Sequence, residues 1–285
     1  MITGSSGRVT LPNSGPPNTA MDKPRTALLN RAMILRTLLL STMLAAALPS
    51  IAAEKDTRSF EMRTYYAAPG KLDDLLARFR DHTVKLFEKH GITNIGYWVP
   101  IENKDNKLVY VIAFPSREAQ AKSWKEFGAD PDWQAARKAS EEKGKLVTKA
   151  ESVFLNATDF SPAIKPSAAA PRVFELRTYT TTPGNLGRLQ ARFRDHTVAL
   201  FQKHGMTNLF YWIPMADQKT ADNTLVYLLA HASAEAAKAS FTSFRGDPVW
   251  VAAKEASEKD AGGSLTTPDG VKSEFLKALD FSPTK

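Results

Sequence analysis

The chain has 285 residues, of which 43% are hydrophobic and 24% are charged; this composition excludes collagen-like and wholly disordered proteins, and the length favours two domains. It contains no cysteine, which excludes disulfides, thiolate metal sites and cysteine nucleophiles. The net charge is +8, but basic residues are interleaved with acidic ones rather than gathered in a stripe, so we expect no nucleic-acid partner.

The N-terminal residues have the layout of a secretory signal. Residues 37–48 (TLLLSTMLAAAL) are uncharged and mostly apolar, follow several arginines, and precede small residues that end at Ala53. Such a stretch is too short to span a bilayer as a helix, which takes about 20 residues. We therefore expect residues 1–53 to be a disordered N-terminus plus a signal peptide, cleaved after Ala52 or Ala53. The mature protein would be exported, periplasmic or secreted, with no stable membrane span after cleavage; an uncleaved anchor is the alternative.

The mature part begins with a strand and a long helix. Residues 60–66 alternate apolar and polar side chains, which predicts a half-buried strand. After the Pro69–Gly70 turn, apolar residues recur at helical spacing over residues 71–90. This pattern predicts an amphipathic helix that ends at Gly91.

Two strands, a helical region and a last strand follow. The strands are predicted over residues 94–100 and 107–114, and the helical region from residue 116. The pair Asp130–Pro131 is typical of a helix start, so a second helical segment is expected there. A short strand near residues 152–156 completes the order β-α-β-β-α-β, which is that of a ferredoxin-like fold.

This unit occurs twice. Residues 60–100 align without a gap with residues 174–214, and after short insertions the two copies match again as far as a shared DFSP string. The Pro/Ala-rich residues 163–172 separate the copies and have no apolar periodicity. We therefore expect a first domain over residues 54–162, a linker over 163–172, and a second domain over 173–285.

Several strings recur in both copies in the same order: E-[ML]-R-T-Y-x3-P-G, F-R-D-H-T-V, K-H-G-x-T-N-x2-Y-W-x-P, D-P-x-W and D-F-S-P. Together they resemble the NIPSNAP family, which is similar to the dimeric α+β barrel superfamily, and the resemblance covers nearly all of residues 58–283. It implies an α+β protein whose two tandem ferredoxin-like βαββαβ domains form an intrachain dimeric α+β barrel. The superfamily includes cofactor-free oxygenases, isomerases and decarboxylating enzymes that act on small aromatic or hydrophobic compounds, and some members bind haem.

Four of the five histidines form two repeat-related pairs, His82 with His196 and His90 with His204. On a helical wheel, His90 lies in the apolar stripe beside Gly91, which favours a structural contact with the helix end. His82 and His196 lie on the flank, where a neutral imidazole can reach a cleft between helix and sheet and act as a general base or polar anchor. They are therefore the candidate catalytic residues, and a histidine that braces helix against strand is the alternative.

The first strand of each copy carries an arginine among aromatic residues. Period-2 alternation places Arg63 on the same face as Glu61 and Tyr65, so the arginine either pairs with a carboxylate or forms a fork for an anionic ligand. Aromatic side chains in such strands either fill a core or offer area to a hydrophobic ligand. The candidate ligand-binding residues are Arg63, Arg177, Tyr65, Tyr179, Tyr97, Trp98, Tyr211 and Trp212.

Sequence motifs of metalloproteases, serine hydrolases, dinucleotide-binding proteins and P-loop proteins do not occur. We expect no metal site and no cofactor, with a histidine-bound haem as a minor alternative. The favoured function is an exported protein that binds a small hydrophobic or aromatic molecule in its barrel, with cofactor-independent acid–base chemistry as an extension. The alternative is a non-catalytic protein-interaction or structural module. A second copy of the chain is a further expected partner, as a homo-oligomer.

Overall fold

The computed structural model describes residues 55–169 and 172–285. The expected signal peptide and its cleavage position lie outside these residues. The elements of the first half are β1 (Ser59–Ala67), α1 (Leu72–Arg78), η1 (Phe79–Thr83), α2 (Val84–Lys89), β2 (Thr93–Pro100), β3 (Lys107–Phe114), α3 (Arg117–Ala129), α4 (Pro131–Ser140) and β4 (Val147–Ala157). Those of the second half are β5 (Val173–Thr181), α5 (Leu186–Arg192), η2 (Phe193–Thr197), α6 (Val198–Lys203), β6 (Thr207–Pro214), β7 (Thr224–His231), α7 (Ala234–Arg245), α8 (Pro248–Ala261) and β8 (Thr266–Ala278).

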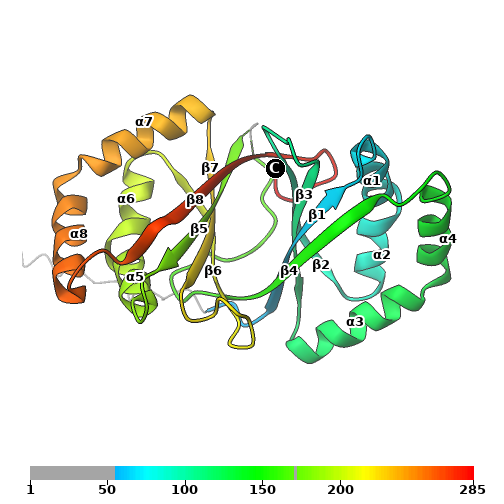
Figure 1. Ribbon diagram of the computed structural model, residues 1–285, viewed down its shortest axis with the longest axis horizontal. Coiled ribbons are helices and arrows are strands. Elements are labelled where there is room, and N and C mark those ends of the chain that lie inside the picture. The colour runs from blue at the N-terminus through cyan, green and yellow to red at the C-terminus, as the bar shows by residue number, and fades with distance from the viewer. Residues whose placement is uncertain (1–54, 170–171) are drawn as a thin grey trace, which may run out of the picture. The chain divides into compact units, whose positions relative to one another are not determined.

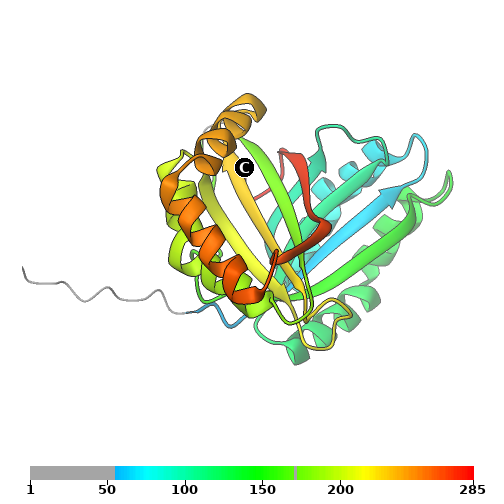
Figure 2. The same cartoon turned by 60° about the vertical axis from the view of Figure 1, so that its left-hand side comes forward.

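The strands close into one antiparallel barrel, in the order β1-β3-β2-β8-β5-β7-β6-β4. Each half supplies a ferredoxin-like sheet, and the two sheets are joined where β2 pairs with β8 and β4 pairs with β6. Helices α1–α4 cover the first sheet and α5–α8 cover the second (Figures 1 and 2). The expected α+β fold, with two ferredoxin-like units in an intrachain barrel, is therefore confirmed.

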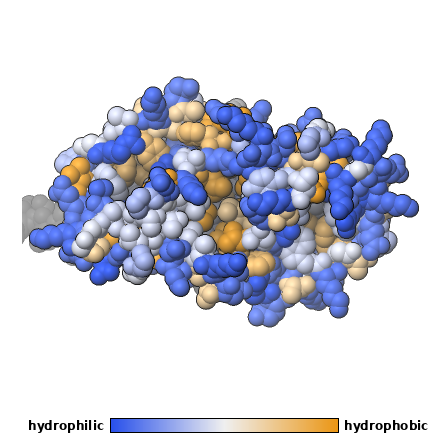
Figure 3. All heavy atoms as spheres, in the orientation of Figure 1, coloured by the Kyte–Doolittle hydropathy of each residue, from blue (hydrophilic) through white to orange (hydrophobic). Residues whose placement is uncertain are grey.

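Alternation along each strand sends side chains either into the barrel or toward the helices. In β1, Phe60 and Met62 point into the barrel, whereas Tyr65 packs with the helices. In β2, Trp98 points inward and Tyr97 points toward the helices. The barrel interior is thus a packed apolar core, and each helix layer forms a further core with its sheet. Hydrophilic residues cover most of the helical flanks in the view of Figure 3.

The helix predicted over residues 71–90 forms in three pieces, because a π-helical turn interrupts it. The string FRDHT makes this turn in both halves, as η1 and η2. Thr83 Oγ1 donates a hydrogen bond to the carbonyl oxygen of Arg78 (3.2 Å), and Thr197 Oγ1 does so to Arg192 (3.1 Å). A π turn holds more residues than an α turn, so the side chains around it are rotated relative to an ideal helical wheel.

The last strand of the first half is longer than predicted. β4 starts at Val147, and residues 147–153 pair with β1 only. Lys149 and Glu151 in this stretch are exposed, as is common on a sheet edge that must not pair with other chains. The alternation that marks a half-buried strand is therefore missing there, which explains why the sequence shows only the final part.

The segment between the halves contributes to the core. Ile164 lies within the expected linker, is only 1% exposed and belongs to the barrel interior. The Lys285 backbone N–H donates to the carbonyl oxygen of Ser167 (3.0 Å), so this segment is held against the end of the second half. Within residues 55–169 and 172–285, no helix has the length and apolar character to span a bilayer.

Candidate functional site

Each half contains a pocket between its helices and the outer face of its sheet. The first pocket has a volume of about 340 Å³ and the second about 250 Å³. The first pocket is lined by Tyr65, Arg78, Phe79, Thr83, Phe87, Trp124, Phe127, Trp133, Arg137, Glu141, Lys145, Val147 and Ala150. The second is lined by Tyr179, Arg192, Phe193, Thr197, Phe201, Phe244, Trp250, Lys254, Glu258, Ser264, Thr266 and Val271.

The π turn positions three of the lining residues in each pocket. In the first half these are Arg78, Phe79 and Thr83, which stand at the start and end of the turn. Their counterparts in the second half are Arg192, Phe193 and Thr197. Because the extra residue in a π turn changes the direction of the side chains around it, π turns are frequent at functional sites.

In the first pocket, a buried arginine is held between a carboxylate and an indole. Arg78 is 6% exposed, and its Nη1 donates to Oε1 of Glu141 (3.1 Å). Its guanidinium carbon lies 5.3 Å from the ring centroid of Trp133. Burial alone would raise the pKa of Glu141, but the hydrogen bond and charge of Arg78 lower it. The Nε–H of Arg78 is buried without an acceptor among the described residues, whereas most buried donors in proteins are paired.

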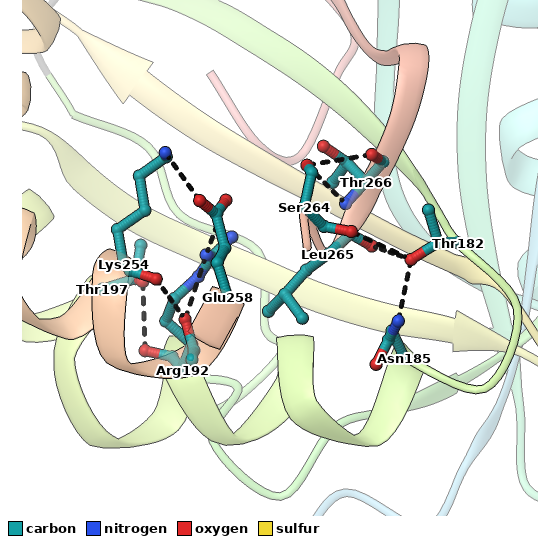
Figure 4. Close-up of polar contacts among 10 residues, drawn as sticks. Thr182, Asn185, Arg192, Thr197, Lys254, Glu258, Ser264, Leu265 and Thr266 are labelled. Carbon is teal, nitrogen blue, oxygen red and sulfur yellow. Dashed lines mark hydrogen bonds and ion pairs between the residues drawn. The ribbon is translucent and has the colours of Figure 1, made fainter. Parts of the chain in front are cut away.

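The second pocket repeats this arrangement with a looser ion pair. Arg192 is 7% exposed and donates from Nη1 to Oγ of Ser257 (3.2 Å), while Glu258 Oε1 is 3.7 Å away. Its guanidinium lies 5.1 Å from the ring of Trp250, and burial lowers its pKa. Its Nε–H is likewise without an acceptor in the described part of the chain. Figure 4 shows Arg192 with Glu258 and Lys254, and in a second group Ser264 and Thr266, which lie just before and at the start of β8.

In β1, Arg63 forms hydrogen bonds with residues of its own strand. Its Nη1 donates to Glu61, and its Nη2 donates to the hydroxyl of Tyr65 (3.3 Å). Glu61 is 1% exposed and also accepts hydrogen bonds from Gln120 and Trp124, each at 2.8 Å. Burial alone would lower the pKa of Arg63, but the nearby phenols and Glu61 raise it. The two Nη groups are therefore engaged by protein groups rather than presented as an open anion fork, while the Nε–H has no acceptor among the described residues.

The second half builds the same network with a different donor. Arg177 donates to Glu175 and to the hydroxyl of Tyr179, the latter at 3.1 Å. The buried Glu175 accepts from Nε2 of His231 (2.9 Å) and from Oγ of Ser273 (2.5 Å). Burial would raise the pKa of Glu175, but these partners, His231 first, lower it. His231 has no histidine counterpart in the first copy, so comparing the copies could not find this role.

The predicted aromatic residues separate into three places. Tyr65 and Tyr179 line the pockets. Tyr97 and Tyr211 lie in the helix-side cores, bonded to Asn94 and Asn208, and burial raises the pKa of both phenols. Trp98 and Trp212 lie inside the barrel. Of the aromatic candidates, only Tyr65 and Tyr179 therefore line the helix–sheet pockets.

The structure places His82 and His196 on the outer surface, away from the helix–sheet pockets. Both are exposed, and they line open grooves between α1 and α4 and between α5 and α8. His90 and His204 instead bond Asp130 (2.6 Å) and Asp247 (2.8 Å), the N-caps of α4 and α8. The second histidine pair thus has the structural role expected for it, although the partner is an N-cap carboxylate rather than the helix end.

The sequence interpretation missed Arg78 and Arg192. Both belong to RFRDHTV, the string that is identical in the two copies, so the signal was present but was assigned to the histidines. Neither pocket lining contains a histidine, so these pockets do not supply the axial ligand of the haem alternative. In the described ranges, no group of three or more acidic or histidine side chains is placed to hold a metal ion.

Comparisons with known proteins agree with this architecture. A sequence model of the NIPSNAP family matches residues 60–162 and 174–283. A structure described as a candidate monooxygenase from Lactobacillus acidophilus NCFM is 10% identical, with 78% of this chain and 94% of that chain covered and a TM-score of 0.51. An anthrone oxidase-like protein is 13% identical, with coverages of 82% and 97% and a TM-score of 0.50.

A third solved structure is similar to part of the chain. A NIPSNAP domain protein from Burkholderia xenovorans is 27% identical and covers 36% of this chain and 98% of its own, with a TM-score of 0.33. No curated protein sequence matches the chain. At 10% and 13% identity, the two longer matches establish a shared fold only.

Proposed function

The chain belongs to the NIPSNAP family, and from that premise we propose that each half binds a small aromatic or hydrophobic molecule in its helix–sheet pocket. The observation that carries this proposal is the repeated pairing of an aromatic lining with a buried arginine whose Nε–H has no acceptor among the described residues. Ligand pockets are mostly apolar, with a few polar groups that fix orientation. The ligand would therefore carry an oxygen that accepts from Arg78 or Arg192.

In this proposal, the aromatic residues of the pocket supply apolar contact and the arginine supplies a hydrogen bond. The rings of Phe79 and Trp133 in the first pocket offer apolar area, and desolvation of a ligand ring against such faces supplies most of the affinity. Arg78 supplies a charge-assisted hydrogen bond, held in place by Glu141 and by the ring of Trp133. This function needs no acid–base step, so a catalytic role for His82 and His196 stays a separate prediction.

Export remains part of the proposal, on the basis of residues 1–53. Their basic, apolar and small-residue regions have the order of a secretory signal. We expect N-terminal sequencing of protein recovered from its own host to begin at Ala53 or Glu54. A sequence that begins upstream of Thr37 would contradict this.

Binding is tested with 2-naphthoate, an aromatic carboxylate, and the double variant Arg78→Lys/Arg192→Lys. Lysine keeps the charge beside Glu141 and Glu258 but lacks the Nε–H donor and the planar fork. We expect calorimetric titration to show naphthoate affinity about tenfold lower than for the parent chain, which corresponds to roughly 1.4 kcal/mol. The same variant should unfold within a few degrees of the parent.

A matched control comes from the same turn of each helix. Arg80 and Arg194 stand two residues further along, are exposed, and pair with Asp81 and Asp159. Arg80→Lys/Arg194→Lys should leave naphthoate affinity unchanged. Equal affinities in both double variants, or no binding to the parent chain, would refute the assignment of the pockets.

A further inference from the structure

The two pockets differ in charge at one position of their rim. Lys145 lines the first pocket, and the residue at the same place in the second is Ser264, since each directly precedes the buried leucine before the last strand. The first pocket therefore has three cationic side chains and one carboxylate, whereas the second has two cations and one carboxylate. Arg137 of the first pocket corresponds to Lys254 of the second, which keeps the positive charge, and Trp124 corresponds to Phe241. The difference in charge between the two linings therefore lies at Lys145 and Ser264.

Lys145 is available to a ligand, whereas Ser264 is already engaged. Lys145 is exposed, and within residues 55–169 and 172–285 it has no ion-pair partner. Ser264 Oγ donates to the carbonyl oxygen of Thr266 (3.0 Å) and accepts from its N–H (3.3 Å). Its own carbonyl accepts from Oγ1 of Thr182 (3.0 Å), as Figure 4 shows. At the rim of the second pocket, Ser264 is therefore already hydrogen-bonded within the protein, and no unpaired charge stands in the place of Lys145.

The carboxylate of each pocket is also shared differently. In the first pocket, Glu141 lies 3.1 Å from Arg78 and 3.5 Å from Arg137. In the second, Nζ of Lys254 forms an ion pair with Glu258 at 2.8 Å, and Nη1 of Arg192 lies 3.7 Å from the same carboxylate. Lys145 is thus the one cationic side chain in the described lining of the first pocket that does not pair with Glu141.

We propose that the two pockets select different ligands: the first an aromatic or hydrophobic molecule with a carboxylate or similar anionic group, the second an uncharged molecule of similar size. This inference rests on the proposed function, because both pockets must bind small molecules for their selectivity to differ. The anionic group would lie between Arg78 and Lys145, where two cations flank it. A charge near a solvent-exposed rim acts through water, so the preference is modest and salt-dependent.

The test uses two probes of the same ring system, 2-naphthoate and 2-naphthylmethanol. The full chain is labelled with 5-fluorotryptophan, and the ¹⁹F resonances of Trp133 and Trp250 report on the first and second pocket separately. Trp133→Phe and Trp250→Phe serve only to assign the two signals. We expect naphthoate to shift the Trp133 signal at about threefold lower concentration than the Trp250 signal at low ionic strength, and the difference to shrink with added salt. Naphthylmethanol should show no such salt-dependent preference.

The charge is then exchanged between the rims. Lys145→Ser/Ser264→Lys should reverse the order in which naphthoate shifts the two signals. Lys143→Ser removes a lysine that lines the outer groove instead, and it should leave the order unchanged. If naphthoate shifts both signals at equal concentrations, or if the order survives the exchange, the selectivity proposal is wrong while the binding proposal stands. If neither probe shifts either signal, both proposals are wrong.

Discussion

Replacing His231 with Phe is expected to lower the free energy of unfolding by about 2 kcal/mol, since the buried Glu175 would lose a hydrogen bond to its charge. His231 is 3% exposed and Glu175 is 2% exposed, so water cannot readily take the place of the imidazole. Arg177 and Ser273 remain as partners of the carboxylate, which limits the loss. Urea unfolding of the full chain at neutral pH measures the change.

The corresponding network in the first half indicates which substitutions should restore the stability lost in His231→Phe. There, Phe114 occupies the position of His231, and Glu61 accepts from Gln120 and Trp124 instead. Transferring this set gives the triple variant His231→Phe, Ala237→Gln, Phe241→Trp. We expect the triple variant to regain most of the stability, because both new side chains donate to the same carboxylate. A triple variant no more stable than the single one would show that the two networks are not equivalent.

The single substitution His231→Phe should also change how the free energy of unfolding depends on pH in the acid range. Because the folded-state pKa of Glu175 lies below its ordinary value of 4.5, its contribution is fully present above about pH 4.5 and is lost as the pH falls through the folded pKa. Without His231 the pKa is lowered less. Stability should therefore fall less steeply with acid below pH 4.5 in His231→Phe than in the parent chain.

Gly96→Ala is expected to destabilise the barrel by about 2–4 kcal/mol, because the ring of Trp98 lies directly over Gly96. A Cβ at residue 96 would come within 2.1 Å of the indole. Trp98 is 1% exposed inside the barrel, so the ring can move only by disturbing its neighbours, and overpacking a core costs about 1–3 kcal/mol or more. Thermal or urea unfolding checks the effect.

Two further variants separate this clash from a general effect of losing a glycine. Gly187→Ala adds a Cβ that meets nothing within 4 Å, and it should be neutral or stabilising by up to about 1 kcal/mol. In a chain that already carries Trp98→Leu, the clashing ring is absent. Gly96→Ala should therefore lower the free energy of unfolding less in the Trp98→Leu chain than in the parent chain. Equal costs in the two backgrounds would show that the ring does not cause the effect.

The order of the elements and their duplication can be predicted from local sequence patterns. Alternation in residues 60–66 and apolar spacing over 71–90 reflect local geometry, which depends on neighbours along the chain. Gly91 and the Asp130–Pro131 pair likewise mark helix ends through local backbone preferences. Recurring motifs then led to the family and, through it, to the barrel.

The location of the pockets depends on how the strands and helices pack, which local patterns do not specify. Period-2 alternation shows that Arg63 and Tyr65 share a face, but both faces of a barrel strand are covered, so the pattern cannot distinguish the helix side from the interior. Trp98 and Tyr65 therefore looked alike as ligand residues, although they lie on opposite sides of the sheet.

The π turn also departs from the helical wheel on which the site prediction rested. A helical wheel assumes a constant rotation per residue, and the extra residue in η1 breaks that assumption. His82, expected to reach a cleft between helix and sheet, is exposed, while Arg78 lines the pocket. The hydrogen bond from His231 to Glu175 could not be predicted from the sequence either, because His231 lies on a neighbouring strand of the sheet and is far from Glu175 in the chain. Such contacts depend on which strands pair and how the helices pack on them, and those are properties of the assembled barrel.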